Sequence, residues 1–218
     1  MVSKTIIFIS IFLSIIFIFL SYFGIVRYIT IYCKSVDSYV ETYQKLKPND
    51  TKVIVSIYTD DINNIKNVIK SVLDQTVKIH SIHVYTSKED IGDIPEYLQK
   101  IAQVSIVNKK YKKLGNVIPI LSYEGDGEVT IISIQDDHIY GIDTFELLLE
   151  QSKKDPYKLI YFKNKDYTNG ILFKPKFFDI DVLDYDGETS YTDWINNNLK
   201  KTGFKTIDVK YNDTYKKI

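Results

Sequence analysis

The chain of 218 residues contains a single cysteine, Cys33, which excludes an internal disulfide framework and a zinc cluster built from cysteines. It has no net charge, because 28 Lys and Arg residues balance 28 Asp and Glu residues. No overall field therefore draws it to nucleic acid or to an acidic surface. It also contains no glycine-rich phosphate loop of the form G-x-G-x-x-G or G-x-x-x-x-G-K-[ST]. The length and composition therefore predict one domain of ordinary size, without nucleic acid as a partner.

A long uncharged run near the N-terminus, residues 5–26, consists mostly of Ile, Phe and Leu. A helix of this length would reach about 33 Å, enough to cross the hydrocarbon core of a bilayer, which is roughly 30 Å thick. A cleavable signal peptide has a shorter apolar core and a small-residue cleavage site. We therefore expect an uncleaved transmembrane signal-anchor over residues 1–34.

The charges that flank this run do not decide its orientation in the membrane. Lys4 stands on one side, and Arg27 and Lys34 stand on the other, so the positive-inside rule is close to a tie. The sequons at Asn49 and Asn212 would be glycosylated only if the C-terminal part is lumenal. A single-pass type II protein of the endoplasmic reticulum or Golgi of a host cell is one arrangement that fits, and the orientation stays open.

Residues 35–51 are polar and without a clear period, which predicts a stem in front of a soluble domain over residues 52–218. In that domain, β-branched runs alternate with amphipathic segments, which favours an α/β fold with a mostly parallel sheet flanked by helices. The pattern predicts strands over residues 53–58, 79–85, 104–107, 129–134, 159–162, 171–173 and 204–209. It predicts helices over residues 62–73, 94–101, 114–123, 144–151 and 190–201.

The strand predicted over residues 129–134 ends at two adjacent acids, Asp136 and Asp137. In open α/β sheets ligands bind just beyond the carboxyl ends of the strands. Acids at this place can hold a hard divalent cation, which in turn holds phosphate oxygens. From this stretch alone, a solvated turn is an equally good interpretation. For His138 we expect local hydrogen bonding rather than metal ligation, with its side chain on the opposite face from Asp137 if the backbone stays extended.

The order and spacing of six segments in the soluble domain are informative about its family. A strand and a polar turn, Val53-Ile-Val-Ser-Ile-Tyr-Thr59, precede a helix that ends in Ser71-Val-Leu-Asp-Gln-Thr76. After these come Ser81-Ile-His-Val-Tyr85, Ile131-Ile-Ser-Ile-Gln-Asp-Asp-His-Ile-Tyr140, Asn169-Gly-Ile-Leu-Phe-Lys-Pro-Lys-Phe-Phe178 and Tyr191-Thr-Asp-Trp-Ile-Asn-Asn-Asn-Leu199. In order and spacing they resemble the nucleotide-sugar glycosyltransferases of GT-A (Rossmann-like) fold, particularly the family-2-like group. The resemblance spans roughly residues 52 to 210.

This resemblance implies transfer of a sugar from a nucleotide-sugar donor to a hydroxyl of a glycan, protein or lipid acceptor. Asp136 and Asp137 would bind Mn²⁺ or Mg²⁺, which bridges the diphosphate of the donor and neutralises charge on the departing nucleotide. Thr59 and Asp60 would lie near the nucleoside. Asp193 would be the base that deprotonates the attacking hydroxyl.

Two departures from the family pattern weaken this reading. Gln135 stands where the usual triplet has its first acid, and an amide is a weaker cation ligand, whereas Asp137 keeps the position of the usual metal ligand. The segment 112–119 is shorter than the corresponding segment of the similar enzymes, which carries a lysine. Either Lys112 or Lys113 could take the place of that lysine, and spacing does not decide between them.

A third departure concerns the base, because ungapped alignment puts Thr192 at its position and Asp193 one residue beyond. Three hypotheses follow from these observations. The first is a membrane-anchored, metal-dependent glycosyltransferase, which is our prediction. The second is a catalytically degenerate relative that acts as a binding or scaffold protein. The third, an unrelated α/β nucleotide-binding or phosphate-transfer domain, is disfavoured by the absence of a glycine-rich phosphate loop.

Overall fold

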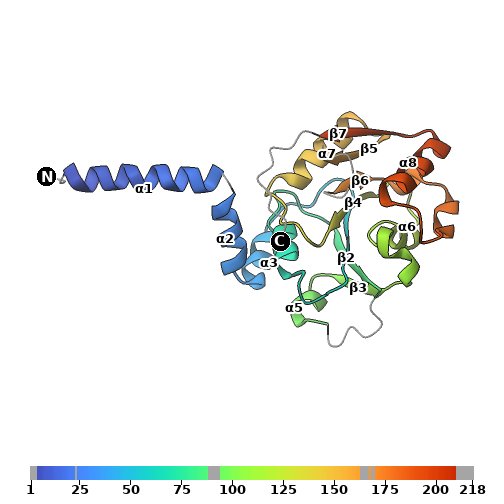
Figure 1. The fold of residues 1–218 in the computed structure, drawn as a ribbon, viewed down its shortest axis with the longest axis horizontal. Helices are drawn as coiled ribbons and strands as arrows, with labels where there is room; N and C mark the ends of the chain where they lie inside the picture. Colours follow the sequence, from blue (N-terminus) through green and yellow to red (C-terminus); the bar gives the residue numbers. More distant parts are fainter. Residues whose placement is uncertain (1–3, 23, 88–93, 163–166, 168–169, 210–218) are drawn as a thin grey trace.

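The structure is a computed structural model of the chain, and it describes residues 4–22, 24–87, 94–162, 167 and 170–209. The described strands are β1 (Val53–Tyr58), β2 (Ser81–Thr86), β3 (Gln103–Ile106), β4 (Thr130–Gln135), β5 (Lys158–Phe162), β6 (Ile171–Phe173) and β7 (Lys205–Val209). They form one seven-stranded sheet in the order β3-β2-β1-β4-β6-β5-β7 (Figure 1). Neighbouring strands are parallel, except that β6 runs antiparallel to β4 and β5.

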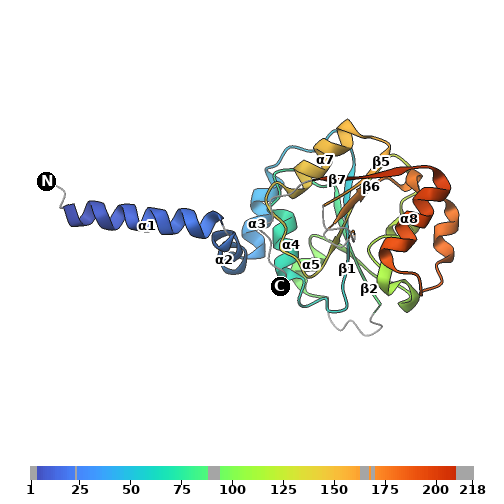
Figure 2. The same ribbon diagram turned by 45° about the horizontal axis from the view of Figure 1, so that its top comes forward.

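Helices cover both faces of this sheet, as Figure 2 shows for α4 and α8 on opposite sides. One face packs against α2 (Ile25–Cys33), α3 (Val36–Gln44), α4 (Lys66–Leu73), α5 (Glu96–Gln99) and α7 (Thr144–Lys154). The other face packs against α6 (Ile118–Tyr123), α8 (Tyr191–Thr202) and three 3₁₀ helices, η1 (Lys109–Leu114), η2 (Pro175–Phe177) and η3 (Ile180–Asp184). This layered α/β architecture confirms the predicted fold class.

The central strands are buried on both faces, as their unbroken apolar sequences predict. In β1, Val55 and Ile57 belong to the core under α4, whereas Ile54 belongs to the core under α6 and α8. In β4, Ile132 and Ile131 divide in the same way, because successive side chains of a strand point to opposite faces. The segments that follow β1 and β4, which carry Asp60 and Asp61 and Asp136 and Asp137, therefore extend from strands that are packed on both faces.

The apolar N-terminal run forms α1 (Lys4–Tyr22), which projects away from the domain in Figure 1. Its window Lys4–Ser21 has a mean hydropathy of 2.4 and no buried residue, so this helix is long and apolar enough to cross a membrane. The helix is shorter than the predicted run of residues 5–26. Gly24 takes a positive φ of 66°, which glycine adopts without steric cost, and a separate helix, α2, begins at Ile25.

The helices that follow α1 pack directly against the domain. Ile31 of α2 and both Val36 and Tyr39 of α3 are buried in the core shared with α4. Within the segment 35–51, which is predicted to be a stem, α3 thus contacts the core of the domain.

Candidate functional site

The predicted acids lie at one edge of the sheet because the strands that precede them are parallel neighbours. Tyr58 and Gln135, the last residues of β1 and β4, are partners in the sheet register. The segments 59–61 and 136–138 therefore leave the sheet side by side at its carboxyl edge. This is the edge at which ligands bind in open α/β sheets.

A cavity of about 670 Å³ lies at this edge and is lined by four carboxylates. Asp60 and Asp61 come from the end of β1, and Asp136 and Asp137 come from the end of β4. The metal hypothesis requires that Asp137 line a cavity, and it does. The remaining wall is formed by Tyr32, Asn63, Asn64, Ile65, Lys66, Asn67 and Lys70.

Asp136 is half-buried beside Thr59, which is itself fully buried. Burial raises the pKa of Asp136 above its ordinary value; a hydrogen bond with the Thr59 side chain opposes this rise, and the charges of Asp137 and Asp60 add to it. The Thr59 hydroxyl also accepts a hydrogen bond of 3.0 Å from the main-chain N–H of Asp61. Crowded like charges of this kind favour a bound cation, because a cation relieves their mutual repulsion.

Asp137 lies in a turn and is paired with the next residue. The backbone turns at residues 136 and 137, so the extended geometry on which the opposite facing of His138 and Asp137 depended does not continue past β4. Nδ1 of His138 hydrogen-bonds Oδ1 of Asp137, which confirms the predicted local role of this histidine. The hydroxyl of Tyr140 braces the start of this turn, because it accepts a hydrogen bond of 2.9 Å from the N–H of Gln135 and donates one of 3.3 Å to the carbonyl of Gln135.

Asp60 is held by two partners from the neighbouring segments. Nζ of Lys112 lies 2.6 Å from Oδ2, and the hydroxyl of Tyr58 donates to Oδ1 at 2.8 Å. Burial alone would raise the pKa of Asp60, but the hydrogen bonds and charge of Lys112 and Tyr58 lower it below its ordinary value. The Tyr58 ring lies against Gly115, where an added Cβ would be only 2.0 Å from Cδ2 of the ring. Gly115 therefore permits the close approach that places Tyr58 beside Asp60.

Two lysines of α4, which sequence reasoning missed, also line the cavity. Lys70 is buried, and its ammonium donates to the main-chain oxygens of Ile31 at 2.9 Å and of Tyr32 at 3.4 Å. Burial lowers the pKa of Lys70, and the charge of Lys66 acts in the same direction. The spacing of four residues, which stacks both lysines on one helix face beside the acids, was the signal that could have identified them.

Asp193 lies in the first turn of α8 and is exposed. Its main-chain N–H donates to Oγ of Ser190 at 3.2 Å, and the Ser190 hydroxyl donates back to Oδ2 at 2.6 Å. This reciprocal pair caps the helix. Asp193 is not among the residues that line the acidic cavity, so the structure does not bring it together with Asp136 and Asp137.

The donor set of the cavity fits a hard cation that is bound together with a substrate. Among the described residues, no three His, Cys, Asp or Glu side chains form a complete metal centre. Mg²⁺ sites commonly use one or two carboxylates and take their remaining ligands from water and substrate phosphates. Asp136 and Asp137 would supply such a pair.

The structure was compared with solved structures. It matches 4-diphosphocytidyl-2C-methyl-D-erythritol synthase from Anaerococcus prevotii with a TM-score of 0.52 and 15% identity, over 78% of this chain and 93% of that chain. A protein assigned as a nucleotide-diphospho-sugar transferase, from Desulfovibrio desulfuricans, matches with a TM-score of 0.50 and 11% identity, over 73% of this chain and 80% of that one. The chain has the fold of the nucleotide-diphospho-sugar transferases.

A second 4-diphosphocytidyl-2C-methyl-D-erythritol synthase shares this fold, with a TM-score of 0.55 and 11% identity over 78% of this chain and 93% of that chain. Comparison with protein-family models and with curated protein sequences gave no match. The likeness is therefore one of architecture, and it agrees with the GT-A (Rossmann-like) fold that the sequence predicts.

Proposed function

We propose that the chain is a membrane-anchored glycosyltransferase that moves a sugar from a nucleotide-diphosphate donor to an acceptor hydroxyl with the help of a divalent cation. One observation carries this proposal: the acids that follow β1 and β4 line a single cavity at the carboxyl edge of the sheet. The fold supports it, because one neighbour of this fold is named as a nucleotide-diphospho-sugar transferase.

In this proposal Asp136 and Asp137 would hold Mn²⁺ or Mg²⁺ together with the donor. Their oxygen ligands suit either hard cation. When bound, the cation would act as a Lewis acid that neutralises charge on the departing nucleotide. Lys66 and Lys70, which also line the cavity, would add positive charge that balances the phosphates.

Thr59 and Asp60 would position the nucleoside, since they continue β1 into the cavity edge. Lys112 would then fill the place of the lysine that similar enzymes carry in this segment, because it is bound to Asp60. Asp193 would deprotonate the acceptor hydroxyl, for which its carboxylate must exchange the Ser190 hydroxyl for that of the acceptor. The acceptor would be a glycan, protein or lipid that approaches the exposed N-terminal end of α8.

The proposal is tested by donor binding to the full chain in lipid nanodiscs. We expect uridine, guanosine or cytidine diphosphate to bind only with Mn²⁺ or Mg²⁺, and binding to be lost in Asp137→Asn. The matched control is Asp50→Asn, an exposed acid outside the cavity, which should bind as the wild type does. Binding without a cation, or unchanged binding by Asp137→Asn, would contradict the proposal.

A second candidate function is nucleotidyl transfer, because a further structural neighbour, from Bacillus anthracis, is assigned as a glucose-1-phosphate thymidylyltransferase; it matches with a TM-score of 0.50 and 15% identity, over 77% of this chain and 89% of that chain. Incubation with a nucleoside triphosphate and a sugar 1-phosphate would then release pyrophosphate, whereas a glycosyltransferase releases nucleoside diphosphate. A catalytically degenerate relative is the alternative that Gln135 supports. It would bind the donor with a cation but release neither pyrophosphate nor nucleoside diphosphate.

A further inference from the structure

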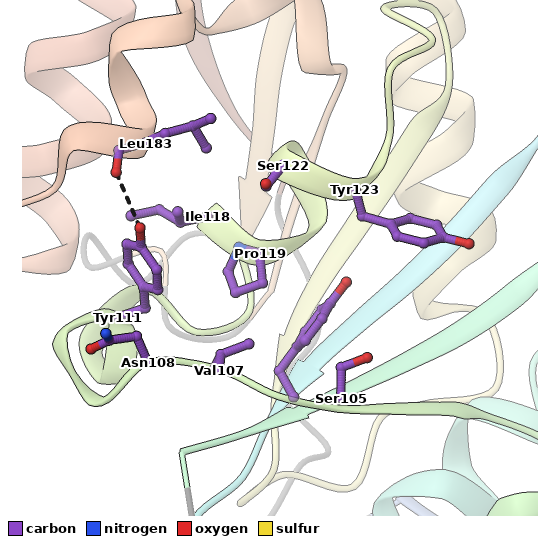
Figure 3. Close-up of a pocket in the computed structure, with 10 residues that line it drawn as sticks. Ser105, Val107, Asn108, Tyr111, Ile118, Pro119, Ser122, Tyr123 and Leu183 are labelled. Atoms are coloured by element: carbon purple, nitrogen blue, oxygen red, sulfur yellow. Dashed lines mark hydrogen bonds between the residues drawn. The ribbon is translucent and has the colours of Figure 1, made fainter.

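A second cavity, of about 450 Å³, lies on the sheet face that α6 covers, between β3, η1 and α6 (Figure 3). It shares no lining residue with the acidic cavity. Its size falls in the range of small-molecule sites in proteins, about 300–1,000 Å³. Its lining consists of Tyr85, Ser105, Val107, Asn108, Tyr111, Ile118, Pro119, Ser122, Tyr123 and Leu183.

None of these ten residues carries a formal charge, in contrast to the four carboxylates and two lysines of the acidic cavity. A phosphate or carboxylate ligand would be left without a counter-charge here, so the lining selects a neutral ligand. Three tyrosine rings and a proline offer flat apolar surfaces, whereas two serines and Asn108 offer hydroxyl and amide groups. A sugar ring matches this mixture, because it has apolar C–H faces and a rim of hydroxyl groups.

One polar group of the lining has an unmet hydrogen-bonding capacity. Tyr85 is only 4% exposed, and among the described residues its hydroxyl has no hydrogen-bond partner. An unpaired buried hydroxyl is unfavourable, because it has given up its hydrogen bonds to water without replacing them. The neighbouring Tyr123 is 59% exposed, and its ring contacts His83 with 5.0 Å between the ring centroids, so a ligand that reaches the Tyr85 hydroxyl would lie beside an accessible aromatic ring.

The 3₁₀ helix η1 joins this cavity to the acidic one. Tyr111 of η1 lines the neutral cavity, and its hydroxyl donates to the carbonyl of Leu183 at 3.2 Å across one side of it (Figure 3). The next residue, Lys112, is bound to Asp60 of the acidic cavity. A ligand that contacts Tyr111 therefore lies one residue from a side chain that holds the acidic site.

We propose that the cavity between β3, η1 and α6 binds a neutral saccharide unit, whose ring stacks on Tyr123 or Tyr111 and whose hydroxyls bond to Ser105, Ser122, Asn108 and Tyr85. The proposal concerns binding alone and does not depend on the proposed transferase activity. It assigns to the chain a saccharide site separate from the acidic cavity.

The test uses the full chain in phosphatidylcholine nanodiscs, which avoids the sugar headgroups of maltoside detergents. Saturation-transfer NMR would be recorded with the methyl glycosides of glucose, galactose, mannose and N-acetylglucosamine, each at about 10 mM, enough to fill most of a site with a Kd of about 1 mM. We expect at least one glycoside to bind. Its Kd should rise about fivefold or more in Tyr123→Ala, which removes a stacking ring.

Two further variants distinguish a specific site from nonspecific binding. Tyr85→Phe removes only the unpaired hydroxyl and should weaken binding while leaving thermal stability unchanged or higher. Tyr157→Ala removes a tyrosine outside the cavity that is 67% exposed, against 59% for Tyr123, and should have no effect. The proposal is overturned if no glycoside binds, if binding survives both Tyr123→Ala and Tyr85→Phe, or if uridine or adenosine binds there and no glycoside does.

Discussion

The guanidinium of Arg27 donates two hydrogen bonds to the main-chain carbonyl of Tyr140, at 3.2 Å from Nε and 2.7 Å from Nη2. The same side chain forms an ion pair with Asp74 at the end of α4. Tyr140 in turn braces the turn that carries Asp136 and Asp137 through its hydroxyl bonds to Gln135. The first helix after the apolar segment is thus connected, through one arginine, to the edge of the acidic cavity.

Replacing Arg27 with methionine should destabilise this junction by about 1.5–3 kcal/mol, the usual worth of hydrogen bonds to a charged group. Chemical unfolding of the full chain in nanodiscs measures the loss, and hydrogen exchange should rise in residues 136–140. Arg27→Lys keeps the charge beside Asp74 but cannot reproduce the fork of donors. Its stability should therefore lie between that of the wild type and that of Arg27→Met. Unchanged exchange in Arg27→Met would show that the arginine does not brace the acidic turn.

Gly115→Ala should destabilise the chain by about 1–3 kcal/mol, as overpacking typically does, because its Cβ would lie 2.0 Å from the Tyr58 ring. The displaced ring would also withdraw the Tyr58 hydroxyl from Asp60, so affinity for a nucleoside diphosphate should fall. Gly125→Ala is the matched control, since nothing lies within 4 Å of its added Cβ. Thermal unfolding of both variants decides the matter, and equal melting temperatures would contradict the prediction.

The central strands β1 and β4 were predictable because their β-branched runs are buried on both faces, whereas the helix boundaries depended on tertiary contacts. The apolar spacing predicts a helix from residue 62, but α4 begins at Lys66. Asp61 accordingly caps a turn rather than the helix, since Oδ1 accepts from the N–H of Asn63 and Oδ2 from the amide of Asn64. The antiparallel direction of β6 was likewise invisible, because a three-residue apolar strand carries no signal of direction.

The acids of the site could be located because their position depends only on where two strands end. The contribution of α2 could not be predicted, since nothing local in Ile25–Cys33 reports that its last carbonyls accept the buried ammonium of Lys70. The polar sequence that follows predicts a spacer, yet Val36 and Tyr39 are buried. Long-range contacts of this kind leave no periodic pattern in the sequence from which they could be predicted.

His83 should make stability fall as the pH drops. It is 3% exposed; burial lowers its pKa below the ordinary 6.5, the Glu124 carboxylate opposes this shift, and Lys52 adds to it. Between the two values the unfolded chain binds more protons than the folded one, so the stabilisation is complete above pH 6.5 and is lost as the pH falls toward the folded pKa. Each unit of difference is worth about 1.4 kcal/mol.

The measurement is urea unfolding at pH 7.5 and 5.5, values that bracket the unfolded pKa of about 6.5. His83→Gln, which cannot titrate, should lose less stability than the wild type over this interval. His80→Gln removes an exposed histidine and should retain the wild-type pH dependence. Identical slopes for all three proteins would rule out His83 as the source.

Lys112→Gln should separate a binding role from a structural one. Both partners of the Lys112–Asp60 pair are more than half exposed, at 61% and 55%, so its loss should change stability by at most about 1 kcal/mol. Affinity for a nucleoside diphosphate should nevertheless fall, because the lysine positions Asp60 and adds positive charge near the phosphates. Lys100→Gln breaks the exposed ion pair of Lys100 with Glu96, outside the acidic cavity, and should leave affinity unchanged.

Asp193→Asn tests the proposed base, because an amide keeps the shape of the side chain but cannot accept the proton of an acceptor hydroxyl. General base catalysis typically contributes about 10²- to 10⁴-fold, so kcat should fall in this range while the cation-dependent affinity for the donor stays unchanged. Ser190→Ala removes the helix cap but leaves the carboxylate, at a cost of about 0.5–2 kcal/mol in stability. If the two variants lose stability alike and both keep kcat, Asp193 is only a capping residue and the base lies elsewhere.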